Sequence, residues 1–254
     1  MPVHLKGGCR VSGWKEGEPL NHGKLRIWRH AMGADTISLR VLEFAAGLSP
    51  GLRNPGCDEV LYVVEGTGTV FLDGSPRRVS PETGFFLPPG VGLTVENPGP
   101  GALTLVGSQC PDPGASVAFE RPRTSLEPGA SRAGAEPFVR FSEQPTQRAG
   151  DGRWFRVLVD QESCSAPVTQ FIGAIPPGRA PDHFHEYEEV LCILEGRGLF
   201  WAGETHAAIG PGSCVFLRRG QPHCVENTGD GELRLLGIFY PSGSPAVRYS
   251  PGRM

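Results

Sequence analysis

Four side chains in the second half of this 254-residue sequence have the types and spacing of a metal site. The segment PDHFHEYEEV contains His183, His185 and Glu189, and the later segment GQPHCVEN contains His223. Side chains two apart in a strand point to one face, so His183 and His185 project together, and Glu189 follows them if the strand continues. His223 then has to arrive from a neighbouring strand. Imidazole suits Fe, Ni, Cu and Zn, and a carboxylate adds Mn, so the pattern predicts one divalent metal ion per chain.

The elements that hold these side chains are predicted to be short strands. The sequence has 36 Gly and 25 Pro, which leave few uninterrupted windows for helices. The segments 60–64 and 190–194 are apolar and rich in β-branched residues, and a Gly-x-Gly turn follows each one. Short strands at regular intervals are typical of an all-β sandwich or barrel.

The sequence contains an internal repeat at an offset of 130 residues. Between 59–111 and 189–241 there are 19 identities in 53 positions without a gap. We therefore expect an N-terminal domain over 1–111, a linker over 112–136 and a C-terminal domain over 137–254. The linker is rich in Pro, Gly, Ala, Ser and Arg.

The first copy lacks the histidines. At the repeat offset, Arg53, Pro55 and Leu93 stand where the second copy has its three histidines, and only Glu59 matches Glu189. We therefore expect no metal to bind the first copy through this set. Either Glu59 pairs with Arg53 in place of the lost ion, or Arg53 points to solvent.

The two segments with the candidate ligands resemble the two sequence motifs of the cupin superfamily. HFHEYEEVLCILEG fits the first motif, and PGSCVFLRRGQPHCVEN fits the second except that Arg218-Arg219-Gly220 replaces the usual Pro-x-Gly. The resemblance spans about 200 of the 254 residues and implies a bicupin, with two tandem jelly-roll barrels (double-stranded β-helices). It also implies that His183, His185, Glu189 and His223 ligate one Fe, Mn, Zn, Ni or Cu ion.

Several residues near the candidate ligands are candidates for contact with a substrate. Gln170, Phe171, Trp201 and Phe216 lie on strands next to the predicted site, where a role in the core is the alternative. Arg218 and Gln221 precede His223 on a loop and are suited to bind a carboxylate or phosphate, with solvated loop side chains as the alternative. Cys224 is expected to point away from the metal.

Composition argues against several classes of partner. The net charge of −3 argues against a nucleic-acid surface, and no apolar run is long enough to span a bilayer. The first residues lack the apolar stretch of a signal peptide, and seven cysteines without a CxxC pair favour reduced thiols, so we expect a cytoplasmic protein. A small-molecule partner and a monomer or homodimer are expected.

Three functions fit these observations. The first is a metal-dependent dioxygenase acting on a small organic substrate that chelates the metal, because oxygen chemistry benefits from an apolar barrel. The second is a non-redox enzyme such as a decarboxylase, isomerase, lyase or an aminohydrolase resembling the ureidoglycine aminohydrolases, in which the metal acts as a Lewis acid. The third is a metal- or metabolite-binding cupin without enzymatic activity. Dioxygenase activity is the first of these hypotheses.

Overall fold

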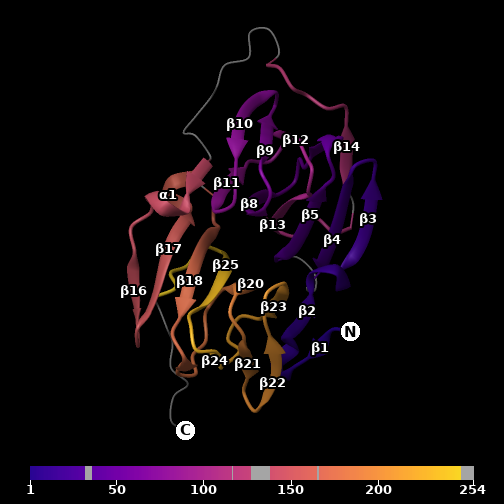
Figure 1. The fold of residues 1–254 in the computed structure, drawn as a ribbon. Coiled ribbons are helices and arrows are strands. Elements are labelled where there is room, and N and C mark those ends of the chain that lie inside the picture. Colours follow the sequence, from indigo (N-terminus) through magenta and orange to yellow (C-terminus); the bar gives the residue numbers. More distant parts are fainter. Residues whose placement is uncertain (32–35, 116, 127–137, 165, 247–254) are drawn as a thin grey trace. The chain divides into compact units, whose positions relative to one another are not determined.

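The computed structural model describes residues 1–31, 36–115, 117–126, 138–164 and 166–246. These residues form two compact units. The N-terminal unit comprises the described parts of 17–142 together with 162–164, and the C-terminal unit comprises 1–16, 143–161 and 166–246. Both units consist almost entirely of strands, which confirms the all-β prediction (Figure 1).

The N-terminal unit contains two antiparallel sheets. The seven-stranded sheet has the order β15 (Phe138–Arg140), β11 (Thr83–Leu87), β8 (Asp58–Glu65), β13 (Leu103–Cys110), β5 (Ser38–Phe44), β4 (Leu25–Ala31) and β3 (Glu18–His22). The second sheet has the order β10 (Ser75–Val79), β9 (Gly68–Leu72), β12 (Gly92–Asn97), β7 (Gly51–Arg53) and β14 (Ala118–Glu120), and β6 (Gly47–Leu48) pairs with β12.

The C-terminal unit repeats this plan. Its larger sheet has the order β1 (Val3–His4), β2 (Arg10–Gly13), β23 (Ser213–Leu217), β20 (Glu188–Glu195), β25 (Leu233–Tyr240), β18 (Thr169–Ile175), β17 (Arg153–Val159) and β16 (Gln147–Gly150). Its smaller sheet has the order β19 (Gly178–Arg179), β24 (His223–Asn227), β21 (Gly198–Ala202) and β22 (Thr205–Ile209). The short helices are α1 (Gln161–Cys164) and the 3₁₀ turns Lys6–Gly8, Trp14–Glu16 and Phe141–Glu143. None of the described helices is long and apolar enough to cross a membrane.

In each unit a cluster of buried apolar residues lies between the two sheets. In the N-terminal unit, Leu61 on β8 packs in one cluster with Val95 on β12. In the C-terminal unit, Leu191 on β20 packs in one cluster with Val225 on β24. Alternate residues of each strand enter these cores. The two sheets of each unit therefore face each other across the core, as in a jelly roll.

The sequence repeat is visible in the central strands. β8 and β20 are both eight residues long. In its sheet, β8 lies between β11 and β13, and β20 lies between β23 and β25. Gly66 and Gly196 follow them with φ near 82° in both cases, a left-handed conformation that favours glycine. The Gly-x-Gly segments are therefore turns, as the repeat predicts.

The two halves of the chain exchange strands: β1 and β2 belong to the larger sheet of the C-terminal unit, and β15 belongs to that of the N-terminal unit. β2, from the start of the chain, pairs with β23 of the C-terminal unit, with Arg10 opposite Phe216. β15, which precedes the second copy, pairs with β11 of the N-terminal unit, with Arg140 opposite Thr83. The predicted boundaries 1–111, 112–136 and 137–254 follow the sequence repeat and therefore do not contain this exchange.

Part of the predicted linker forms regular structure. Within 112–136, β14 pairs with β7, so that Phe119 lies opposite Leu52. Residues 127–136 of this segment lie outside the described residues.

Candidate metal centre

The four candidate ligands come from three neighbouring parts of the C-terminal unit. His183 and His223 form an isolated antiparallel bridge, in which each backbone N–H donates to the carbonyl of the other residue at 3.0 and 2.8 Å. This bridge holds the two imidazoles side by side, with ring centroids 4.5 Å apart. Glu189 is the second residue of β20, and His185 lies in the segment before that strand. The predicted even step from His185 to Glu189 is not a continuous strand, because the chain bends at 186–187.

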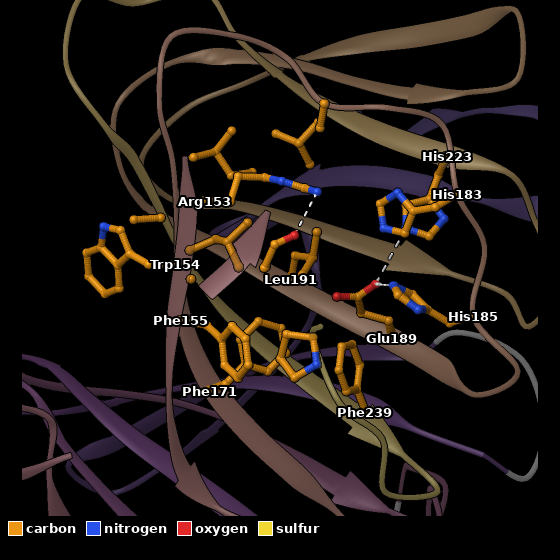
Figure 2. Close-up of a pocket in the computed structure, with 18 residues that line it drawn as sticks. Arg153, Trp154, Phe155, Phe171, His183, His185, Glu189, Leu191, His223 and Phe239 are labelled. Carbon is orange, nitrogen blue, oxygen red and sulfur yellow. Dashed lines mark hydrogen bonds and ion pairs between the residues drawn. The ribbon is translucent and has the colours of Figure 1, made fainter. Parts of the chain in front are cut away.

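The side chains converge closely (Figure 2). One ring nitrogen from each of His183, His185 and His223 lies within 4.8 Å of the others. The Glu189 Oε2 atom lies 3.7 Å from the Nε2 atoms of both His185 and His223. Ligand atoms bound to one first-row metal ion at about 2.1 Å lie about 3–4 Å apart, so these side chains are grouped closely enough to be candidates for a shared ion.

Backbone carbonyls orient two of the imidazoles. Nδ1 of His183 lies 3.1 Å from the carbonyl of Pro181, and Nδ1 of His223 lies 2.9 Å from the carbonyl of Gln221. A carbonyl accepts only, so each Nδ1 carries the proton and donates it, which leaves the Nε2 lone pair free. Metal-ligating histidines are held in this way by their second ring nitrogen.

Burial changes the protonation of the cluster. It raises the pKa of Glu189 from 4.5 to about 8, because an ionised carboxylate is costly to remove from water. Burial also lowers the pKa of His223, and the neighbouring His183 lowers it further. At neutral pH the cluster without a cation therefore favours a neutral His223 imidazole and a protonated Glu189 carboxyl. A divalent cation would supply the positive charge that Glu189 otherwise lacks, so the donor set fits a metal ion.

A pocket with a cavity volume of about 80 Å³ opens onto these residues. Most of its walls are apolar, and Figure 2 shows Phe155, Phe171, Leu191 and Phe239 along them. Arg153 extends into the pocket from the side opposite the histidines and is the one cationic arginine or lysine among the described residues that line it. Its Nη2 donates to the carbonyl of Ala149 at 3.2 Å and to the Asp151 carboxylate at 3.3 Å.

Of the six predicted substrate contacts, Phe171 lines this pocket and the other five do not. Gln170 is fully buried but lies next to Phe171 on β18, so strand alternation turns it to the opposite face of the sheet. Phe216 lies between Val215 and Leu217 on β23. Because those two side chains enter the core between the sheets, the Phe216 side chain faces the opposite side of the sheet.

Trp201, Arg218 and Gln221 also lie elsewhere. The Trp201 indole donates to Glu226 at 2.8 Å, and the Arg179 guanidinium lies 4.2 Å from its ring centroid. The side chains of Arg218 and Gln221 lie against the glycines of the first 3₁₀ turn, Gly8 and Gly7. The prediction that Arg218 and Gln221 lie at the site assumed that neighbours of His223 in sequence face the metal, whereas strand β24 begins only at His223.

Sequence reasoning missed several residues of the pocket. Arg153, Phe155 and Phe239 belong to β17 and β25, which carry no motif that connects them to the histidines. Tyr187 was also missed. Its ring stacks on His185 at a centroid distance of 4.9 Å, and its hydroxyl donates to the carbonyl of Ser244. The alternation of Arg153, Phe155 and Val157 predicts one shared face, but it does not say which barrel that face lines.

The structure corrects which residues of the first copy stand in the places of the histidines. Leu93, the counterpart of His223, pairs with Leu52, so Leu52 rather than Arg53 stands in the place of His183. By alternation, Asn54 then corresponds to His185 instead of Pro55. The first copy has one more residue between this position and its glutamate, which the ungapped repeat comparison could not reveal.

The predicted pairing of Glu59 with Arg53 is wrong. Glu59 forms a buried ion pair with Arg40. Arg53 does not point to bulk solvent either, because its guanidinium binds Asp73 at 2.8 Å and Glu120 at 2.7 Å.

Comparison with known sequences identifies the repeated unit. The family model described as a cupin domain matches residues 41–107 and 171–239, which together are more than half of the chain. An uncharacterized protein of Methanocaldococcus jannaschii, MJ1618, is 29% identical over 94 residues, which are 36% of this chain and 75% of that protein. An oxalate-binding protein of Thermotoga maritima is 36% identical over 67 residues, which are 26% of this chain and 55% of that protein.

Solved structures share the fold over most of the chain. A mutant of oxalate decarboxylase from Bacillus subtilis superposes with a TM-score of 0.71 and 13% identity, covering 90% of this chain and 76% of that one. A putative glyoxylate-induced protein from Pseudomonas aeruginosa superposes with a TM-score of 0.72 and 17% identity, covering 96% of this chain and 93% of that one. At these identities the likeness concerns the fold.

Proposed function

Because the chain belongs to the cupin superfamily and has two cupin domains, we propose that its C-terminal unit is a metal-dependent enzyme domain. In this proposal His183, His185, Glu189 and His223 hold one divalent ion, and the enzyme is a dioxygenase that acts on a small organic acid. The observation that carries the proposal is the convergence of three imidazoles and a carboxylate at the end of an apolar pocket. When bound, a metal ion in such a site offers open positions for substrate oxygens and for O₂.

Arg153 suggests the chemistry of the substrate. In this proposal the Arg153 guanidinium exchanges its ion pair with the exposed Asp151 carboxylate for one with a substrate carboxylate, and the apolar pocket strengthens that interaction. Because Arg153 faces the histidines across the pocket, the proposed substrate has two polar ends. One end carries adjacent hydroxyl or keto oxygens suited to chelate a metal, and the other carries a carboxylate. Phe171 and Phe239 contact the apolar body between them and exclude water.

The scarcity of proton-transfer groups favours dioxygenation. Apart from the four candidate ligands and Arg153, the described residues that line the pocket are apolar, except for the Trp154 indole, which donates to Glu232 at 2.8 Å. Hydrolysis and isomerisation need a general acid or base near the reacting atoms. Dioxygenation places both oxygen atoms of O₂ in the product and takes all electrons from the substrate, so it needs neither a positioned acid nor an added reductant.

Decarboxylation is the second candidate. It is favoured by the likeness of the sequence to an oxalate-binding protein and of the fold to oxalate decarboxylase, for which Mn(II) centres are described. In that reaction Arg153 would bind a carboxylate, and the metal would act as a Lewis acid on the reacting one. Loss of CO₂ leaves a carbanion that has to be protonated, and water entering the pocket is the available donor.

Oxygen consumption distinguishes the two candidates. Metal-loaded protein is tested with oxalate and with a panel of hydroxy- and keto-substituted aromatic and aliphatic acids, while O₂ and CO₂ are measured together. The proposal predicts stoichiometric O₂ uptake with at least one acid, and the loss of that uptake in His223→Ala but not in Leu93→Ala, the counterpart in the N-terminal unit. Release of CO₂ without O₂ uptake would support decarboxylation instead, and turnover of neither kind would favour a binding protein.

A further inference from the structure

The N-terminal unit contains a cavity of its own that the proposed reaction does not use. It has a volume of about 300 Å³ and lies within this unit. The residues that line it are Arg40, Leu52, Arg53, Asn54, Pro55, Gly56, Glu59, Leu87, Gln109, Pro113, Val117 and Ala118. We propose that this cavity is a second binding site, independent of metal, for small uncharged molecules that carry a carbonyl and an N–H group side by side, such as amides and cyclic ureides.

The first observation is the buried ion pair at the base of the cavity. Arg40 on β5 and Glu59 on β8 are only 3% and 2% exposed, and they bind each other. Both strands flank β13, where Gly107 lies opposite Arg40 and Gln109 lies opposite Glu59. The pair has no net charge, yet a guanidinium has five N–H groups and a carboxylate has about four acceptor sites, so both retain capacity for a ligand.

The second observation is the amide of Gln109. This residue is 4% exposed, lines the cavity, and its side chain makes no hydrogen bond within the described part of the chain. The corresponding residue of the C-terminal unit is the apolar Phe239, which lies opposite Glu189 as Gln109 lies opposite Glu59. The Gln109 amide is not among the buried polar atoms that lack a partner, so it is accessible from the cavity that it lines, whereas an apolar side chain in the same place would offer no polar group. The amide is thus available to a molecule inside the cavity.

The third observation is the charge of the surroundings, which disfavours an anion. Arg53 lies at the cavity, but its Nε donates to Glu120 at 2.7 Å, its Nη2 donates to Asp73 at 2.8 Å, and its Nη1 donates to the carbonyl of Gly90. Two guanidiniums therefore face the three carboxylates of Glu59, Asp73 and Glu120. An anionic ligand would meet net repulsion, and a cation would compete with both arginines.

An uncharged ligand with adjacent donor and acceptor groups matches the polar side chains of Arg40, Glu59 and Gln109. Its N–H would donate to the Gln109 or Glu59 oxygens, and its carbonyl would accept from Gln109 or Arg40. Leu52, Leu87 and Val117 would contact the body of a ring. Volumes of this size are common for sites that bind small molecules.

The test uses the full chain, stripped of metal with a chelator, so that it does not depend on the proposed enzymatic function. Binding of uracil, 2-pyrrolidone and urea is measured by calorimetry and by the shift of the thermal unfolding midpoint. Two probes serve as controls: 1,3-dimethyluracil has the same ring without N–H groups, and benzoate is an anion of similar size. Gln109→Leu removes the amide with little change of volume, and Gln147→Leu removes an exposed amide on β16 as the matched control.

We expect at least one of the three uncharged probes to bind and to raise the midpoint, while 1,3-dimethyluracil and benzoate do not. Gln109→Leu should weaken the binding about tenfold or more, and Gln147→Leu should leave it unchanged. The comparison of uracil with its dimethyl derivative needs no variant and so stands even if Gln109→Leu does not fold. Absence of binding by all three probes at about 10 mM, equal binding of 1,3-dimethyluracil, or preferential binding of benzoate would overturn the proposal.

Discussion

The protonation of Glu189 makes a quantitative prediction for the protein without metal. Because burial raises the pKa of this carboxyl from 4.5 to about 8, the folded state favours the protonated form. Its contribution to stability is fully present below pH 4.5 and is lost as the pH rises toward 8. Each pKa unit corresponds to about 1.4 kcal/mol, so the loss between pH 5 and pH 8 is roughly 3 to 4 kcal/mol.

Glu189→Gln keeps the size of the side chain and removes its titration. His223 acts in the opposite direction, because burial lowers its pKa and its contribution is lost as the pH falls below 6.5. His223 is present in both proteins, so the difference between wild type and Glu189→Gln isolates the carboxyl. We expect the free energy of unfolding of the variant relative to wild type to rise by roughly 3 to 4 kcal/mol from pH 5 to pH 8.

Urea unfolding in the presence of EDTA measures this difference. Glu195→Gln, at the exposed end of the same strand, is the matched control and should track wild type at each pH. A difference between wild type and Glu189→Gln that stays constant from pH 5 to pH 8 would refute the argument, because it would mean that Glu189 is solvated like an ordinary surface carboxyl.

Three further predictions follow from the same residues. Metal binding at pH 6 should release close to one proton per ion and should tighten toward pH 8, because Glu189 has to ionise; calorimetry in buffers of different ionisation enthalpy measures this. Arg153→Met should raise KM for an acidic substrate by roughly ten- to a hundredfold with unchanged metal content, as measured by steady-state kinetics and elemental analysis. Gly237→Ala should destabilise the protein by about 1–3 kcal/mol, as measured by urea unfolding, because a Cβ there would lie 2.2 Å from the Phe171 ring.

The sequence allowed much of the fold to be predicted because the repeat and the strand period are local signals. Equal spacing of EVL and EG in both copies correctly aligned β8 with β20. The convergence of His183, His185, Glu189 and His223 was also predictable, since the spacing within each motif is short. By contrast, the pairing of β2 with β23 depends on contacts about 200 residues apart, and nothing in Arg10–Gly13 specifies which barrel it joins.

Five of the six proposed substrate contacts lie outside the pocket for a different reason. Period-two alternation shows that Gln170 and Phe171 face opposite sides, but it does not show which side is the interior. Arg153 lies 30 residues before His183, on a strand whose place in the sheet depends on its pairing with β18. The one-residue difference between the two copies near Asn54 is likewise invisible until Leu52 is seen opposite Leu93.

The central claim is that four side chains of the C-terminal unit bind a single metal ion. It is tested most directly by elemental analysis of protein purified without added metal and again after reconstitution and removal of excess ion. We expect close to one transition-metal ion per chain in wild type and in Leu93→Ala, and close to none in His185→Ala and His223→Ala. Equal metal content in wild type and in the histidine variants, or no retained ion in wild type after reconstitution, would contradict the claim.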